Sequence, residues 1–451
     1  MTMSLSSRKG ENYVKHVDLT QGKVATSLLK LSLPIIATSL LQMSYNFIDM
    51  LLVGRLGSEA VASIGLVSFL MGMVQSIQTM VIVGTGIVVA HAIGSKDEKR
   101  QHQNINAGFR LSLGFGILLS LAMLLMGPAY FTFMDIGNPY VENLANAYLR
   151  ASVPGLFFTF LNLWYARVYN SFGLNKKAFN ISAAGFIINI ILAPILIYGL
   201  SWGVVGAGLS TFGANLVMSG LFFFDSRKLF SLDLKMPIQR STYYKVLRLG
   251  FPISIQRVLF SVVNIILGSM ITSFGAEAIA AQKIGLQIES ITYLVGFSLN
   301  NAAASFSGQN YGGGHYNRIK EGVRVTISMG SLYAILTSAI LLAFPETLAR
   351  FFVDEPQTVE ITANYLRFMG ATQIFMMVEI IYNGVFVGLG LPKIPAINSI
   401  IFTVVRVPLA MLFISWLGVN GIWLSISISM FFKGCTATVI YLYRVKPKRL
   451  T

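Results

Sequence analysis

Asp49 is the residue whose type and position best fit chemistry inside an apolar segment. It lies in the sequence SYNFIDMLLVGRLG, within an apolar run over 25–53, and it is the only acid deep in the first half of the chain. A charged side chain at such a depth costs about 3 kcal/mol or more unless it faces a cavity or a partner. Gln42, Tyr45 and Asn46 share its helical face, at spacings of seven, four and three residues. The pattern predicts a polar stripe lining the substrate path, in which Asp49 binds and releases a proton.

Four ionisable residues interrupt the apolar runs of the second half of the chain. They are Arg257, Glu289, Glu379 and Arg406, two of each sign. Because the signs balance, these residues can neutralise one another as buried ion pairs that hold this half together. The alternative is a substrate or ion site, and the pattern alone does not choose between the two.

The composition identifies the elements that must position these residues as membrane-spanning helices. Hydrophobic residues make up 54% of the 451 residues and charged residues 12%, and the mean hydropathy is +0.67. A soluble domain carries about 25% charged residues. Since about 20 apolar residues span the hydrocarbon core, the apolar runs predict an all-α, polytopic membrane protein of twelve helices. The runs are 25–53, 60–92, 105–126, 145–170, 179–200, 204–224, 246–274, 279–306, 323–344, 361–387, 394–417 and 419–443.

Basic residues concentrate on one side of the predicted bundle. The chain carries 34 Lys and Arg against 18 Asp and Glu, and the basic residues cluster in alternate connections such as 94–104, 225–248 and 315–324. The opposite connections include the acidic stretch PETLARFFVDEPQTVE. The positive-inside rule therefore predicts a plasma-membrane protein with both termini cytoplasmic. The net charge of +16 is then a topological bias, and no nucleic-acid partner is expected.

The two halves of the chain repeat each other. LSLPI at Pro34 matches LGFPI at Pro252, and GSEAVA at Gly57 matches GAEAIA at Gly275, in both cases 218 positions later. Because each half has six helices, both halves enter the membrane in the same direction, and a pseudo-twofold axis runs along the membrane normal. The predicted organisation is a cytoplasmic N-terminal segment (1–24), an N-lobe (25–225), a cytoplasmic linker (226–245), a C-lobe (246–443) and a cytoplasmic tail (444–451).

Asp49 is an exception to this repeat. Its counterpart 218 positions later is Leu267, whereas Asn46 corresponds to Asn264. An acid that occurs in one lobe only favours a coupling role for that residue. The alternative is a structural acid at the outer end of the first helix, paired with Arg55 or capping the second helix.

The sequence also argues against several other classes of function. Cys435 is the only cysteine, and the four histidines show no i, i+4 pairing, so neither a disulfide nor a resident metal is expected. The GxxxxGK[ST] motif of an ATP-driven engine does not occur. A membrane enzyme that uses Glu289 and Glu379 as an acid pair is a minor alternative, because no nucleophile motif or histidine supports it. We therefore expect a protein that is not an enzyme and has no cofactor.

Several motifs together resemble the multidrug and toxic compound extrusion (MATE) family, in its DinF-like prokaryotic branch. They are YNFIDMLLVGRLG, the HAIGSKDEKR sequence at Gly94, INIILAPILIYG and GAGLS, combined with the six-plus-six repeat. The resemblance covers the whole chain. It implies a V-shaped pair of lobes that exchanges cytoplasmic cationic or amphipathic compounds for entering protons or sodium ions.

The resemblance also implies roles for individual residues. In this branch the acid of the first helix is the coupling residue, which is Asp49 here, and Pro34 matches the proline at which that helix bends. The cation site of relatives adds an asparagine and an aspartate four residues apart, and a threonine. These positions hold Asn189, Ala193 and Thr211. Because Ala193 replaces the second acid, a sodium site would have a single carboxylate, and proton coupling is favoured.

The sequence thus predicts a secondary active antiporter that expels organic cations or amphipathic compounds in exchange for protons, as a monomer in the lipid bilayer. Two alternatives within transport stay open. One is sodium-coupled drug antiport. The other is a lipid or polar-metabolite flippase of the same superfamily, for which a strongly cationic central cavity would be typical. Only Arg257 and Arg406 point that way.

Overall fold

The computed structural model describes residues 18–134 and 138–445. Within these ranges the chain forms twelve long α-helices, one short α-helix and two π-helical segments, and it forms no strand. In chain order they are α1 (Val24–Gly54), α2 (Ser58–Gly94), α3 (Glu98–Phe133), α4 (Pro139–Ser171), α5 (Asn175–Pro194), η1 (Ile195–Gly199), α6 (Gly203–Ser226), α7 (Arg240–Thr272), α8 (Ala276–Gly312), α9 (Tyr316–Ala343), α10 (Pro345–Arg350), α11 (Pro356–Gly388), α12 (Lys393–Leu417), α13 (Val419–Ile440) and η2 (Tyr441–Val445). Residues 1–17 of the predicted N-terminal segment and 446–451 of the predicted tail lie outside the described residues.

Each of the twelve predicted apolar runs corresponds to one long helix. Ten of the helices in the described ranges are long and apolar enough to cross a membrane. The other two long helices are α4 and α8, which have 33 and 37 residues and carry internal charges such as Arg167 and Glu289. The short α10 lies in the acidic connection after α9. The predicted all-α membrane fold is confirmed.

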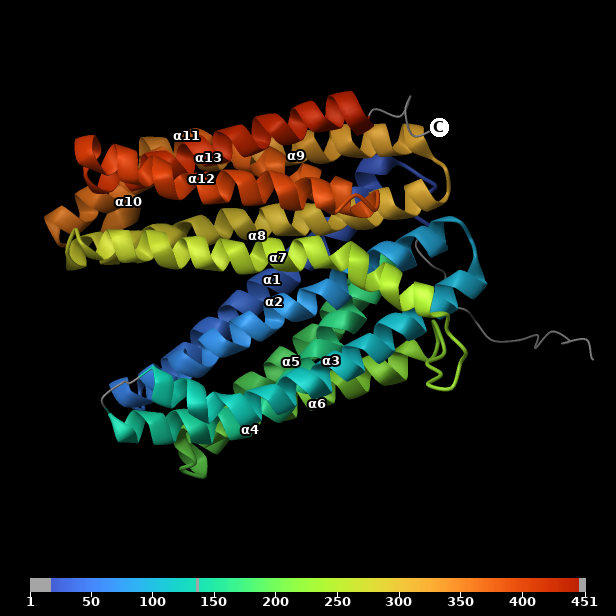
Figure 1. Cartoon of the computed structure of the whole chain (residues 1–451), viewed down its shortest axis with the longest axis horizontal. Helices are drawn as coiled ribbons and strands as arrows, with labels where there is room; N and C mark the ends of the chain where they lie inside the picture. The colour runs from blue at the N-terminus through green and yellow to red at the C-terminus, as the bar shows by residue number, and fades with distance from the viewer. Residues whose placement is uncertain (1–17, 135–137, 446–451) are drawn as a thin grey trace, which may run out of the picture.

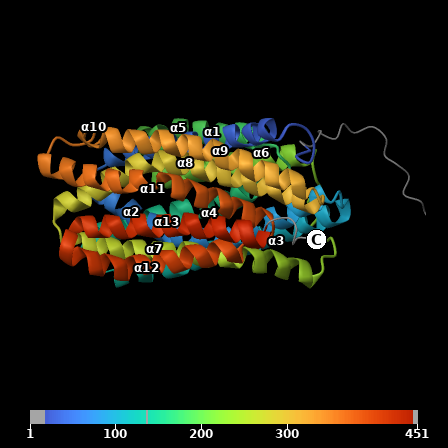
Figure 2. The same ribbon diagram turned by 90° about the horizontal axis from the view of Figure 1, so that it is seen from above.

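The helices pack into two lobes. In the first, α2 packs against α3 and α4, α4 against α6, and α1 against α5; in the second, α8 packs against α11, α11 against α9 and α13, and α12 against α13 and α7. Figure 1 shows the lobes as a lower body from α1 to α6 and an upper body from α7 to α13, and Figure 2 shows the same bundle turned by 90°. The lobes meet at the end where α1 begins and α13 ends, which we call the termini end, and separate toward the opposite, open end (Figure 1).

Glycines let the backbones of the two lobes touch at the termini end. A Cβ added to Gly94 of α2 would lie 1.8 Å from the carbonyl oxygen of Gln309 in α8. A Cβ added to Gly312 of α8 would lie 2.1 Å from the carbonyl oxygen of His91 in α2. Gly94 and Gly312 are 218 positions apart, as are His91 and Gln309. The interface therefore follows the internal repeat, and each glycine is required because any side chain would overlap a carbonyl of the other lobe.

The residues beside these glycines form matching hydrogen bonds between the lobes. His91 Nε2 donates to the carbonyl oxygen of Gly388 over 2.7 Å. Gln309 Nε2 donates to the carbonyl oxygen of Ser171 over 2.6 Å. Because each bond runs from one lobe to a helix end of the other, separation of the lobes at the termini end breaks both.

Helix α1 contacts both lobes. Its first turns contribute Leu28 and Leu31 to an apolar cluster with Ala302 and Phe306 of α8. The helix also packs against α5, and in its later part the Tyr45 ring stacks on Phe186 of α5. The predicted N-lobe begins at residue 25 and so includes all of α1. In the structure the first part of this helix also packs on the C-lobe. The helix continues unbroken through Pro34, and a bend at that residue stays a prediction.

Candidate functional site

Two of the residues predicted to couple transport to an ion, Asn189 and Thr211, meet the predicted path residue Tyr45 in the N-lobe. Thr211 of α6 lies at the centre: its Oγ1 is 3.5 Å from the hydroxyl oxygen of Tyr45 in α1, and it accepts a hydrogen bond of 3.4 Å from Asn189 Nδ2 in α5. The Tyr45 ring stacks on Phe186, with ring centroids 5.4 Å apart. Three helices thus contribute one polar group each to this cluster.

Asp49 lies one helical turn beyond Tyr45 on α1. Its Oδ1 atom is buried and has no hydrogen-bond partner, and its charge interacts with the tyrosines Tyr45 and Tyr148. The ion pairs found among the described residues do not include Asp49. Pairing with Arg55, the structural alternative for this acid, is therefore not formed, and Asp49 is a carboxylate without a counter-charge.

The environment of Ala193 is apolar. The residue is 1% exposed and packs in a cluster that includes Phe160 and Ile197. Among the described residues no group of three or more His, Cys, Asp and Glu side chains converges as a metal site would require. Around Thr211 the structure therefore offers hydroxyl and amide groups and one nearby carboxylate, a donor set with little charge for holding sodium.

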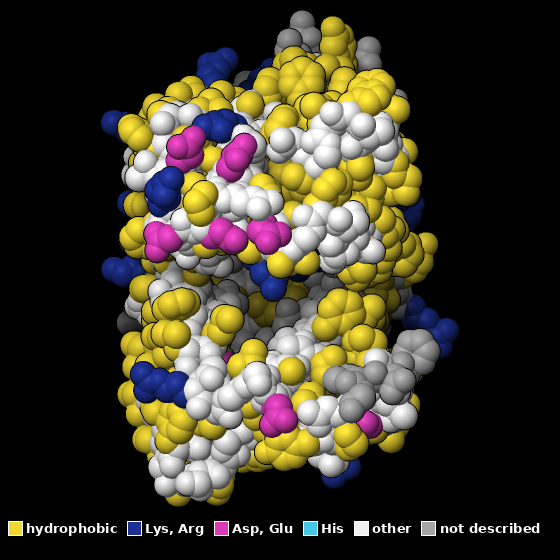
Figure 3. Space-filling model, turned by 90° about the vertical axis from the view of Figure 1, so that its left-hand side faces the viewer, with side chains coloured by type: hydrophobic (Ala, Val, Ile, Leu, Met, Phe, Trp, Pro, Cys, Tyr) yellow, Lys and Arg dark blue, Asp and Glu magenta, His cyan; other side chains and the backbone are white. Residues whose placement is uncertain are grey.

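A cavity of about 480 Å³ lies between the lobes, lined by α2 and α4 of the first lobe and by helices of the second. Its lining includes four cationic side chains and one carboxylate: Arg167 of α4, Arg257 of α7, Glu379 of α11, Arg406 of α12 and Lys433 of α13. Figure 3, viewed from the open end, shows a hollow between the two lobes. The N-lobe wall comes from α2 and α4, and the predicted path residues Gln42 and Asn46 are exposed but do not contribute to this lining. Their role in the path stays a prediction.

Each buried charge of the C-lobe is bound by neutral side chains. Glu379 Oε1 accepts hydrogen bonds of 2.8 Å from both Asn383 Nδ2 and Ser399 Oγ. Glu289, which is 2% exposed, accepts a hydrogen bond of 2.7 Å from the hydroxyl of Tyr365. The carboxylates thus obtain their donors from the lobe itself.

The buried cations follow the same pattern. Arg406 Nε donates to Ser429 Oγ over 2.9 Å, and Lys433 Nζ donates to Thr403 Oγ1 over 2.7 Å. Among the described residues, ion pairs within 4.0 Å form only between Arg100 and Asp97, Lys177 and Asp225, and Arg367 and Glu346. The direct ion pairs expected between the C-lobe charges are therefore not formed.

Arg167 and Lys433 are two lining residues that the sequence analysis did not identify. Arg167 Nη1 donates to Asn301 Oδ1 of the C-lobe over 3.0 Å. Its side chain lies against α2 at Gly86, where a Cβ would come within 2.1 Å of Nε. The sequence does contain a signal for both residues, because each is a single cation inside an apolar stretch: Arg167 in LWYARVYN and Lys433 in MFFKGCTAT.

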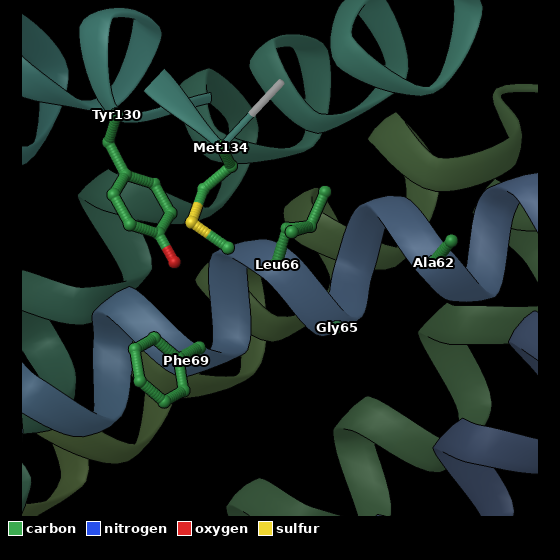
Figure 4. A pocket seen from close by; sticks show the side chains of 6 residues that line it. All are labelled: Ala62, Gly65, Leu66, Phe69, Tyr130 and Met134. Carbon is green, nitrogen blue, oxygen red and sulfur yellow. The ribbon is translucent and has the colours of Figure 1, made fainter. Parts of the chain in front are cut away.

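A second, apolar groove lies near the open end of the N-lobe. It has a volume of about 420 Å³, and its lining comes from α2 and the end of α3. Figure 4 shows that the lining side chains are Ala62, Leu66, Phe69, Tyr130 and Met134, with Gly65 in the helix between them. None of them carries a charge, so this groove provides no group for coupling or for recognising an ion.

Comparisons with known proteins agree with one another over most of the chain. The MatE family profile matches residues 34–195 and again 252–412, and the two matches begin 218 positions apart, as the internal repeat does. The probable multidrug resistance protein YpnP of Bacillus subtilis (strain 168) is 27% identical over 442 residues, which cover 95% of this chain and 97% of that protein. The probable multidrug resistance protein NorM of Thermotoga maritima is 24% identical over 442 residues, which cover 96% and 95%.

Solved structures share the fold. A multidrug resistance MATE family transporter of the MOP superfamily, in an outward-facing conformation, superposes with a TM-score of 0.90 at 23% identity, covering 98% of this chain and 100% of that one. A MOP superfamily transporter from Pyrococcus furiosus gives a TM-score of 0.90 at 22% identity, with the same coverage. At these identities the structures establish the shared fold and leave the ion and the substrate to be argued from the residues.

Proposed function

Because the chain belongs to the MatE family of multi-pass membrane transporters, we propose that it exports amphipathic compounds, organic cations among them, from the cytoplasm in exchange for protons that Asp49 carries. The observation that supports this most is the carboxylate of Asp49, which has a buried oxygen without a partner beside the Tyr45, Asn189 and Thr211 cluster. An acid in this position is a group that can hold either a proton or the positive charge of a substrate.

Exchange requires that proton binding and lobe movement be linked. Asp49 lies on α1, whose first turns pack on the C-lobe and whose later turns pack on α5 of the N-lobe. When Asp49 is protonated, the neutral group is stable in the closed N-lobe. When it is ionised, the uncompensated charge favours hydration or a cationic guest. The two states therefore favour different packing of α1, which spans both lobes.

The proposal includes an orientation in the plasma membrane. The basic connections between α2 and α3, α6 and α7, and α8 and α9 lie at the termini end, and the acidic connection around α10 lies at the open end. With the basic side cytoplasmic, both termini are cytoplasmic and the hollow of Figure 3 faces outward. We propose that the transporter acts as a monomer.

Sodium coupling is the alternative, and the surroundings of Ala193 weigh against it. The position that would supply a second carboxylate is an alanine buried in an apolar cluster. A cation such as sodium needs several oxygen ligands and gains affinity with ligand charge, whereas a proton needs one titrating group.

Transport in proteoliposomes tests this proposal. Efflux of ethidium is measured with an imposed pH gradient or an imposed sodium gradient, each applied separately, for the native protein, for Asp49→Asn and for the exposed control Glu59→Gln. We expect export driven by the pH gradient in the native protein and the control, and none in Asp49→Asn. Export driven by the sodium gradient alone, or full pH-driven export by Asp49→Asn, would overturn the proposal.

A further inference from the structure

The polarity of the central cavity does not match a site built for cations. Arg167, Arg257, Arg406 and Lys433 line it, and Glu379 is the single carboxylate among the lining residues. Glu289 interacts with Arg406, but it lies behind the lining, bound to Tyr365. The cations therefore outnumber the acids even when both carboxylates are counted.

We propose that the C-lobe wall of this cavity binds the anionic group, a carboxylate or a phosphate, of compounds that the protein transports. The inference rests on the export function proposed above and adds amphiphiles that carry an acidic group, bound in the central cavity, to the organic cations that Asp49 accommodates. The missing negative charge is the main argument, because buried charge that the protein itself does not compensate is costly and a ligand of opposite charge removes that cost.

Arg406 has the geometry of an anion-binding residue. It is 4% exposed and lines the cavity, and its one hydrogen bond among the described residues goes through Nε to Ser429. Its two terminal nitrogens are thus left without a hydrogen-bond partner in the described structure. Paired guanidinium nitrogens bind a carboxylate or phosphate in a bidentate fashion, which is the strongest form of such contacts.

Arg257 and Lys433 add positive charge around the same space. Arg257 is exposed to the interior of the cavity, and no hydrogen bond of its guanidinium group is found among the described residues. Lys433 is 6% exposed, and it is repelled by the charge of Arg406 and attracted by that of Glu379, the one carboxylate of the lining. An anion placed between α7, α12 and α13 relieves that repulsion, whereas a cationic ligand increases it.

Arg167 brings a cation from the other lobe. It crosses from α4 to Asn301 of α8, and its buried Nε has no partner. Since the lobes contact each other through this bond, an anion in the cavity faces positive charge on both lobes while the termini end is closed. The positive charge around the ligand therefore depends on the position of the lobes, which links binding of the anion to lobe movement.

The rest of the wall is suited to an apolar body. Phe260 and Phe297, Met376 and Ile380 line the same cavity, and a volume of about 480 Å³ lies within the range that holds small organic ligands. The combination of apolar wall and clustered cations describes an acidic amphiphile. The acidic group can come from a free organic acid or from a lipid headgroup, which share this chemistry.

Binding of matched fluorescent probes tests the proposal without transport. Dansylglycine carries a carboxylate, dansylglycinamide is its neutral counterpart, and dansylethylenediamine is cationic. Affinities are measured for the purified full chain in nanodiscs of phosphatidylcholine. We expect dansylglycine to bind about ten-fold or more tightly than the amide, the ratio that one charge-assisted contact supplies. Equal binding of the three probes, or preference for the cationic one, would overturn the proposal.

Substitutions locate the site. Arg406→Gln and Arg257→Gln are each expected to weaken dansylglycine binding about ten-fold while leaving dansylglycinamide binding unchanged. Arg257→Gln serves as the second variant in case Arg406→Gln folds poorly, because no side-chain hydrogen bond is lost with it. Arg324→Gln, on α9 and away from the lining, is the charge-matched control. Undiminished dansylglycine binding by folded Arg257→Gln and Arg406→Gln would refute the assignment.

Competition identifies the source of the anion. Displacement of dansylglycine by citrate added in solution indicates a free acid, and displacement by phosphatidylglycerol included in the nanodisc indicates a lipid headgroup. Failure of both anions to compete would contradict the site. The two proposals fail separately: loss of anion binding leaves pH-driven export through Asp49 untouched, and unimpaired export by Asp49→Asn leaves anion binding untouched.

Discussion

Gly94→Ala tests whether the backbone contact between the lobes sets the conformation of the transporter. The new Cβ would lie 1.8 Å from the carbonyl oxygen of Gln309 and 2.7 Å from its carbonyl carbon. Real Cβ contacts do not fall below 3.0 Å, so the two backbones must separate by about 1.2 Å at this point, which is the difference between 3.0 and 1.8 Å. Neither partner is a flexible side chain, so the lobes themselves must move.

The size of the effect follows from this overlap. Overpacking of a well-packed contact costs about 1–3 kcal/mol, and this cost applies only to the state in which the termini end is closed. A difference of that size shifts the ratio of closed to open molecules by about 5- to 150-fold. Gly312→Ala, the counterpart in the repeat, places its Cβ 2.1 Å from the carbonyl oxygen of His91 and should act in the same direction.

Distances between spin labels report the shift. One pair is placed at the termini end, with Lys99→Cys on α3 and Lys320→Cys on α9. A second pair is placed at the open end, with Ser58→Cys and Ala276→Cys at the starts of α2 and α8. Both pairs are made in a Cys435→Ala background. Double electron–electron resonance should show Gly94→Ala lengthening the first distance and shortening the second.

Gly268→Ala is the matched control, because a Cβ there meets nothing within 4 Å. It should leave both distances as in the native protein. Unchanged distances in folded Gly94→Ala and Gly312→Ala would mean that these glycines do not hold the lobes together, and the account of the closed termini end would fail.

Three further changes follow from the same structure. Ala193→Asp places a second carboxylate one helical turn from Asn189 and should raise sodium-dependent transport in proteoliposomes; identical sodium dependence in both proteins would count against the cation-site geometry. Glu379→Gln keeps an acceptor for Ser399 but removes the one lining carboxylate, so dansylglycine should bind several-fold more tightly, and weaker binding would contradict the polarity argument. Arg318→Gln removes hydrogen bonds to the carbonyl oxygens of Leu19, Gln21 and Gly22 and should lower the free energy of unfolding by about 1–3 kcal/mol, measured by thermal denaturation beside Arg324→Gln; an unchanged melting temperature would refute a stabilising role for this contact.

The helices and the two-lobe organisation could be predicted because their causes are local or periodic. Apolar runs long enough to cross a bilayer report each helix directly, and the constant offset of 218 reports the repeat. The offset also explains the contacts between the lobes, since Gly94 and Gly312 occupy equivalent positions. Ten of the long helices meet the length and hydropathy of a membrane span, and the interiors of α4 and α8 are more polar because their charges face the protein.

The meeting of Tyr45, Asn189 and Thr211 could not be read from spacing. These residues come from three helices, and periodicity within one helix says nothing about which face a second helix presents to it. Only the family resemblance grouped Asn189 with Thr211, and the structure adds the contact of Thr211 with Tyr45. The DinF-like branch and the coupling role of Asp49 stay predictions.

The number of cations in the central cavity could not be predicted from the sequence either, because it depends on which way each side chain points. Arg167 lies four residues from the end of α4, where a cation is normally interpreted as reaching the membrane surface, whereas packing beside Gly86 directs it into the cavity. Arg406 does not form the expected ion pairs, because both acids accept hydrogen bonds from neutral groups of the C-lobe. Ser399 donates to Glu379, and Tyr365 donates to Glu289. Such choices depend on the three-dimensional packing of side chains and leave no trace in the spacing of charges.

Proton counting tests the coupling role of Asp49 most directly. Ethidium is added at saturating concentration to the purified protein in weakly buffered solution, and a pH indicator records the protons released on binding. The account predicts release from the native protein, because the cation replaces the proton on the carboxylate, and no release from Asp49→Asn, whose amide has no proton to exchange. Equal release by the two proteins, with ethidium bound to both, would contradict the claim that Asp49 is the coupling residue.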